Sequence, residues 1–69
     1  MEAQDFMKWV ELTGIIRAKA FVEQIGVSRP IAEGFYRDAK AGLPVDVKRP
    51  IALAMRAVAN GLKPWGDNI

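Results

Sequence analysis

The sequence contains neither cysteine nor histidine. Disulfide bonds are therefore excluded, and so is any zinc site with cysteine or histidine ligands. A serine or cysteine nucleophile activated by a histidine base is excluded for the same reason. A chain without cysteine is also compatible with the reducing cytoplasm. We expect no bound metal and no cofactor.

Long apolar runs are missing as well, and the longest run is much too short to span a bilayer. The first residues, MEAQDFMK, lack the basic start and the apolar stretch of a signal peptide. We therefore expect a soluble cytoplasmic protein that does not contact a membrane. The 69 residues are enough for one domain, residues 1–69, with one small core. Such a core is marginally stable, which favours tight helix packing or a partner subunit.

Charge of one sign is only slightly in excess. Ten Lys and Arg residues against eight Asp and Glu residues give a net charge of +2. This balance is compatible with nucleic-acid binding without being diagnostic of it. The acidic residues are scattered over expected helix surfaces, and no glycine-rich phosphate-binding loop is present. We therefore expect neither an enzyme nor a small-molecule ligand.

Amphipathic helical periodicity covers most of the chain. Apolar residues recur at helical spacing in four segments, about residues 4–13, 18–25, 29–41 and 48–60. A glycine follows or closes each segment, where helices commonly end. Trp9 falls in the apolar stripe of the first segment, so a core position is favoured over a stacking platform for a nucleobase. The pattern predicts an all-α fold, a compact bundle of four to five helices.

The segments between and after these helices give further expectations. Leu43 and Val47 are expected to anchor their loop to the core, and Asp46 to cap the last helix. Leu62 and Trp65 are expected to fold back onto that helix. The tail, residues 66–69, is expected to fray.

The stretch from Ala18 to Arg37, AKAFVEQIGVSRPIAEGFYR, has the pattern of two helices joined by a short turn. Gly26 follows the last apolar residue of the first helix, where a left-handed residue commonly ends a helix. Ser28 is a favourable N-cap for the next helix, and Pro30 fits its first turn. This pattern indicates a helix-turn-helix at about residues 18–37.

Arg29, Glu33 and Arg37 recur every four residues on the exposed face of the second of these helices. One interpretation is a surface ladder of ion pairs. The other is base contact in a DNA major groove, where arginine can bind guanine and glutamate can accept from cytosine. The position of the three residues after a capped glycine turn favours base contact, with Arg29 nearest the helix start.

Four further residues are candidates for contact with the DNA backbone: Arg17, Lys19, Ser28 and Tyr36. For Lys19, an ion pair with Glu23 one turn later is an equally weighted alternative. Tyr36 is expected to reach a phosphate oxygen, the alternative being that its ring covers the edge of the core. Gly34, inside the helix, costs about 1 kcal/mol relative to alanine. It is either tolerated or allows a partner to approach closely.

The stretch AFVEQIGVSRPIAEGFYR resembles the helix-turn-helix of small phage-type Cro-like repressors and of related XRE-like regulators. The resemblance rests on seven residues, Phe21, Ile25, Gly26, Val27, Ser28, Ala32 and Phe35. The flanking helices resemble those that complete the lambda-repressor-like domain. Val22, where the family usually has alanine, and Pro30 depart from the family pattern.

The resemblance implies a DNA-binding transcriptional regulator, a repressor that binds double-stranded DNA as a homodimer on a palindromic operator. Two alternatives remain open at this point. One is a protein-binding helical module, such as an antirepressor or an anti-defence protein. The other is an excisionase-like architectural protein that bends DNA.

Overall fold

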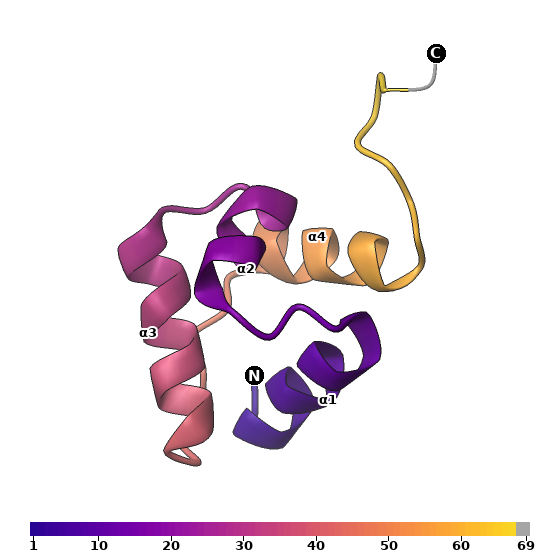
Figure 1. Cartoon of the computed structure of the whole chain (residues 1–69). Helices are drawn as coiled ribbons and strands as arrows, with labels where there is room; N and C mark the ends of the chain where they lie inside the picture. Colours follow the sequence, from indigo (N-terminus) through magenta and orange to yellow (C-terminus); the bar gives the residue numbers. More distant parts are fainter. Residues whose placement is uncertain (68–69) are drawn as a thin grey trace.

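The computed structural model describes residues 1–67, which are helical and contain no strand. The described helices are α1 (Ala3–Thr13), α2 (Ala18–Ile25), α3 (Arg29–Lys40) and α4 (Arg49–Ala59) (Figure 1). The all-α prediction is therefore confirmed, with four helices and no fifth one in the described range. None of these helices is long and apolar enough to cross a membrane.

The helices end where glycines follow the apolar segments. Gly26 adopts φ 92°, a left-handed conformation that other residues rarely take, and its N–H donates to the Val22 carbonyl at 2.9 Å. After α3, the N–H groups of Gly42 and Leu43 donate to the carbonyls of Ala39 and Asp38. These two bonds form a Schellman motif, which closes the end of α3.

The predicted N-cap position of α3 is confirmed, whereas that of α4 is not. Ser28 is the N-cap of α3, in an extended conformation, but its hydroxyl makes no capping hydrogen bond. The N-cap of α4 is Lys48, so the prediction that Asp46 caps this helix is wrong. Asp46 instead lies 3.3 Å from the Lys48 ammonium, and both side chains are exposed. No side chain therefore caps the start of α4.

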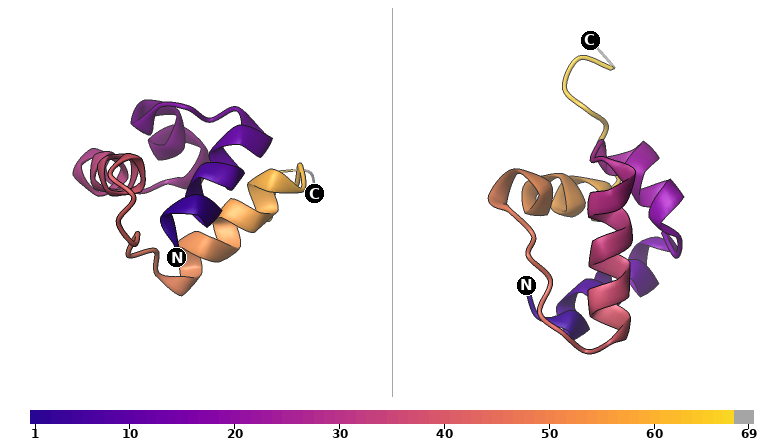
Figure 2. Two further views of the ribbon diagram at one scale, coloured as in Figure 1. Left: turned by 90° about the horizontal axis from the view of Figure 1, so that it is seen from below. Right: turned by 90° about the vertical axis from the view of Figure 1, so that its left-hand side faces the viewer.

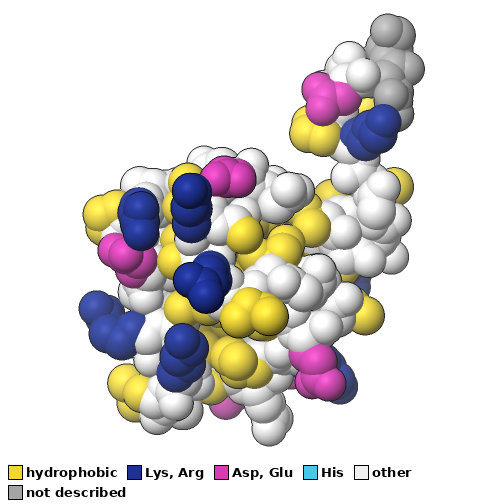
Figure 3. Space-filling model, viewed as in Figure 1, with side chains coloured by type: hydrophobic (Ala, Val, Ile, Leu, Met, Phe, Trp, Pro, Cys, Tyr) yellow, Lys and Arg dark blue, Asp and Glu magenta, His cyan; other side chains and the backbone are white. Residues whose placement is uncertain are grey.

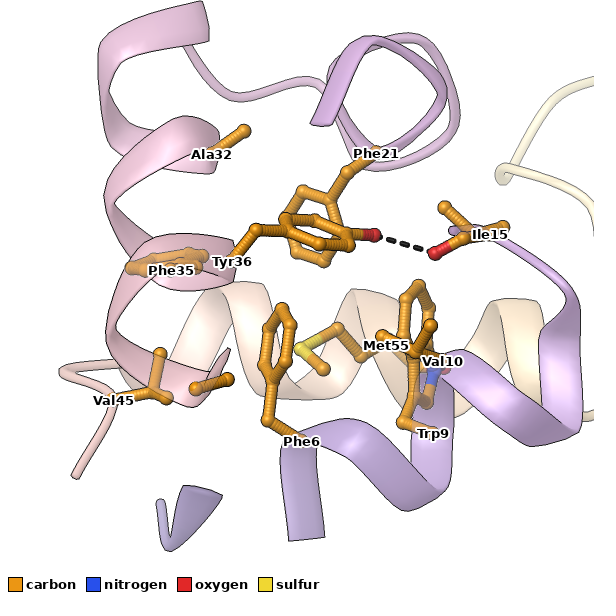
Figure 4. Close-up of a cluster of buried hydrophobic side chains, with 11 residues drawn as sticks. Phe6, Trp9, Val10, Ile15, Phe21, Ala32, Phe35, Tyr36, Val45 and Met55 are labelled. Atoms are coloured by element: carbon orange, nitrogen blue, oxygen red, sulfur yellow. Dashed lines mark hydrogen bonds between the residues drawn. The ribbon is translucent and has the colours of Figure 1, made fainter. Parts of the chain in front are cut away.

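Aromatic side chains from α1, α2 and α3 fill the core (Figure 4). Phe6 and Phe21 are fully buried, with ring centroids 5.9 Å apart. Tyr36 packs its ring edge-to-face on Phe6, at a centroid distance of 5.2 Å. The core position of Trp9 is confirmed, since Trp9 is buried and its indole N–H donates to the Met55 carbonyl at 2.7 Å. This bond ties α1 to α4.

The helices surround this core in a ring of contacts. Helix α2 packs against α3 and α4, and α1 packs against the same two helices (Figure 2). The outer face of α3 is left uncovered along its length. This arrangement leaves α3 at the edge of the molecule, with its N-terminal end beside the turn from α2.

Only one of the two expected residues anchors the loop between α3 and α4, and Val45 anchors it as well. Leu43 is 53% exposed, so its predicted anchoring role is wrong, whereas Val45 is only 1% exposed. Val47 is half-buried, packed against the core as expected. The Val45 N–H donates to the Met1 carbonyl at 2.8 Å, and the Met1 amino group donates to the Val45 carbonyl at 3.0 Å. The N-terminal segment therefore holds this loop in place.

The segment after α4 leaves the helices (Figure 1). Leu62 is 64% exposed and Trp65 is 96% exposed, so the prediction that they fold back is wrong. The Asp67 N–H donates to the Pro64 carbonyl at 3.2 Å, so residues 64–67 form a turn. Residues 68 and 69, the rest of the tail expected to fray, lie outside the described residues.

Candidate functional site

Helix α3 has one buried face and one charged, exposed face. Its buried residues are Ala32, Phe35, Tyr36 and Ala39. Arg29 and Glu33 are exposed, with the Arg29 Nε atom 3.3 Å from the Glu33 carboxylate. Arg37 pairs with its neighbour Asp38 at 3.4 Å. The ladder interpretation therefore accounts for Arg29 and Glu33 only.

A groove of about 670 Å³ runs between this face of α3 and the start of α2. Five basic residues and one acidic residue, Glu33, line it. The basic ones are Arg17, Lys19, Arg29, Arg37 and Lys40. Half of the ten Lys and Arg residues of the chain thus gather in one place, although the net charge is only +2. Figure 3 shows this concentration of basic side chains over α3 and the neighbouring part of α2.

Most cations of this groove are available to a ligand. Arg17, Lys19 and Lys40 form no ion pair within residues 1–67. The predicted alternative of a Lys19–Glu23 pair is therefore wrong. Arg17 is the N-cap of α2, so its side chain lies at the positive end of that helix. The groove is consequently a concentrated site of positive charge.

Two of the residues expected to contact the DNA backbone do not present a free hydroxyl to the basic groove. Tyr36 is 5% exposed, and its hydroxyl donates to the Ile15 carbonyl at 2.6 Å (Figure 4). Its only proton is therefore used inside the protein, and the prediction that this hydroxyl reaches a phosphate is wrong. Burial raises the pKa of Tyr36 to about 12. Ser28 is exposed, but it lies on the other side of α3 from the basic groove.

Lys40 was missed by the sequence interpretation. It follows Arg37 by three residues and Tyr36 by four, so helical spacing places it beside the candidate face. This periodic signal could have identified it. It is the last residue of α3, whereas the residues predicted to contact bases begin at Arg29, at the other end of the helix.

The other side of α3 carries a second, apolar hollow of about 570 Å³. Val27, Ile31 and Ile51 contribute apolar side chains to it, and Gly34 lies between them and Arg37. Arg37 lines both this hollow and the basic groove. The outer surface of α3 is therefore one continuous surface, basic on one side and apolar on the other.

Comparisons of the chain with protein-family models, with curated proteins and with solved structures give no match.

Proposed function

We propose that this protein is a sequence-specific DNA-binding transcriptional regulator, a repressor that inserts α3 into the major groove of double-stranded DNA. The observation that carries the proposal is the gathering of five basic side chains around the exposed face of one edge helix. A cluster of cations on one face suits contact with the phosphates that flank a DNA groove.

Different residues of the groove contact the bases and the phosphates in the proposed complex. Arg29 and Glu33, in the first turns of α3, are the residues for base edges, with Arg37 one turn further on. Arg17, Lys19 and Lys40 are the residues for phosphates. Ser28 remains a phosphate candidate because its exposed hydroxyl makes no hydrogen bond within residues 1–67.

The connection between α2 and α3 supports a helix-turn-helix as the framework of this site. Three residues, Gly26 to Ser28, join the two helices, and Gly26 allows the reversal. Such motifs act in pairs, with recognition helices about 34 Å apart in successive major grooves. We therefore propose a homodimer on a palindromic operator. Exposed apolar residues of α4 and of the following segment, Leu53, Leu62 and Trp65, are candidate dimer contacts.

Selection of bound duplexes from a random pool at low salt tests this proposal. The expected result is an enriched sequence with two-fold symmetry, because each protomer would read one half-site. A pool that stays random after repeated rounds would contradict sequence-specific binding. An enriched site without symmetry would contradict the homodimer while leaving DNA recognition in place.

One observation favours a second candidate function, a protein-binding module. Trp65 is 96% exposed and Leu62 is 64% exposed, and aromatic residues of this kind often anchor protein interfaces. Under this alternative, the protein would form a stable complex with another protein and would show no duplex affinity at low salt. Measuring both affinities on the same preparation separates the two functions.

A further inference from the structure

The apolar side chains of the hollow beside α3 have no part in the phosphate and guanine contacts proposed above, although Ser28 and Arg37 also line this hollow. Ile31 is the third residue of α3 and is 48% exposed at the rim of this hollow. Val27 and Ile51 form apolar walls around it. The two carboxylates of the hollow, Asp38 and Asp46, are each ion-paired with a neighbouring cation. Ile31 is therefore a half-exposed apolar group at the helix end that faces the bases in the proposed complex.

Gly34 opens the surface between Ile31 and the charged face. A Cβ atom at this position would meet only the Arg37 Nη2 atom, at 3.6 Å, which is an ordinary contact. The φ angle of Gly34 also lies outside the left-handed region. Neither side-chain packing nor backbone conformation therefore requires glycine at this position. Without a side chain at position 34, an external group can approach the backbone of α3 between Ile31 and Arg37.

The chemistry of a DNA major groove determines which group would fit. The groove is about 12 Å wide, close to the diameter of a helix with its side chains, so an inserted helix contacts both walls. The apolar group that a base presents in this groove is the C5-methyl of thymine. The charges of the hollow itself balance, because Arg37 and Lys48 pair with its two carboxylates. The excess of positive charge lies in the adjoining basic groove, which Arg37 also lines, and this favours DNA over an apolar peptide as the occupant.

We propose that Ile31 is a specificity-determining residue that contacts the C5-methyl group of a thymine in the operator. This inference rests on the proposed function and names one base that the site reads. Arginine and glutamate on one side of α3 would recognise a guanine–cytosine pair, and Ile31 on the other side would recognise thymine. The two sides together would define the half-site.

Replacing thymines of the selected duplex one at a time with deoxyuridine tests the inference, because this removes only the methyl group. The wild-type protein should bind about fourfold more weakly when one particular thymine is replaced, the value of one buried methyl group. Ile31→Ala should bind the thymine and deoxyuridine duplexes equally. Circular dichroism of this variant checks that the helices are intact.

Leu12→Ala is the matched control, because Leu12 is 71% exposed on α1 and lines neither surface of α3. This variant should keep the wild-type preference for thymine. Equal wild-type binding to every substituted duplex, or a thymine preference that survives in Ile31→Ala, would overturn the inference while leaving DNA binding established. Absence of any duplex binding by the wild type would instead refute the proposed function itself.

Discussion

Tyr36 is the side chain at which the core meets the candidate interface. Its ring lies against Phe6 and Phe21, while its edge lines the basic groove. The hydrogen bond from its hydroxyl to the Ile15 carbonyl fixes the segment that leads into α2. Tyr36 therefore positions Arg17, two residues after Ile15, without contacting a ligand through its hydroxyl.

Replacing Tyr36 with phenylalanine should lower the free energy of unfolding by about 1–3 kcal/mol, because the buried Ile15 carbonyl loses its partner. The wild-type pKa of Tyr36, about 12, exceeds the ordinary value of 10.0. Between these two pH values, the hydroxyl is therefore protonated in the folded protein and ionised in the unfolded chain. The stabilisation is therefore complete below pH 10 and is lost as the pH rises towards 12. Urea titrations of both proteins between pH 8 and 12 should show the difference narrowing at high pH. A constant difference would contradict the account.

Arg29→Ala should weaken binding to the selected duplex by about 1–3 kcal/mol and relax the preference at one base position. Arg56→Ala is its control, since Arg56 is exposed on α4 and does not line the groove. Fluorescence anisotropy with the selected duplex and with single-base variants provides the measurement. If Arg29→Ala and Arg56→Ala bind alike, Arg29 does not contact a base.

At the scale of the helices, glycine has opposite effects at two positions. Gly26 ends α2 in a left-handed conformation, whereas Gly34 lies within α3 with an ordinary φ. The first glycine forms the turn that orients α3, and the second reduces the intrinsic stability of that helix. Gly34 thus lowers the stability of helix α3 at the surface proposed to face DNA.

The same substitution at the two glycines should change stability in opposite directions. Gly26→Ala should lower the free energy of unfolding by about 1–2 kcal/mol, the cost of a Cβ atom in a left-handed residue. Gly34→Ala should raise it by up to about 1 kcal/mol, because alanine favours the helix and meets no close neighbour. Thermal melts of both variants measure the two effects. A destabilised Gly34→Ala would show that the glycine serves packing within the chain.

Helix positions were largely predictable from the sequence, because apolar spacing and glycine report local conformation. The predicted ends at Gly14, Gly26 and Gly42 agree with the structure. Positions in loops were not predictable in this way. Leu43 and Val45 are both apolar and two residues apart, and Val45 is the one that packs into the core and pairs with Met1.

The candidate site was partly predictable for a related reason. Arg29, Glu33 and Arg37 share a face because they lie on one helix, and spacing alone shows this. Arg17 and Lys19 come from a different helix, and their approach to α3 depends on tertiary packing. Tyr36 was misassigned because helical spacing places it at the border between core and surface, where sequence does not reveal the partner of its hydroxyl.

At the scale of the whole molecule, the described chain places its basic groove and its exposed apolar segment on different elements. The groove lies on α2 and α3, whereas Leu62 and Trp65 follow α4. A dimer formed through the latter would leave both copies of α3 uncovered. This separation allows association and DNA binding to be tested independently.

Trp65→Ser should weaken dimer formation by about tenfold or more if Trp65 anchors the interface. Sedimentation equilibrium measures the association, and iodide quenching of the wild type should fall as protein concentration rises. Trp9 is buried and serves as the internal reference for quenching. Unchanged association of Trp65→Ser would place the dimer contact elsewhere.

The salt dependence of duplex binding tests the central claim, that the basic groove holds DNA, most directly. Two triple variants lose the same charge, one in the groove (Arg17, Lys19 and Lys40 to Ala) and one outside it (Lys8, Arg49 and Arg56 to Ala). We predict that wild-type affinity falls steeply with salt, that the groove variant lowers the log–log slope by about three units, and that the second variant leaves the slope nearly unchanged. Equal slopes for the two variants, or a wild-type affinity independent of salt, would contradict the account.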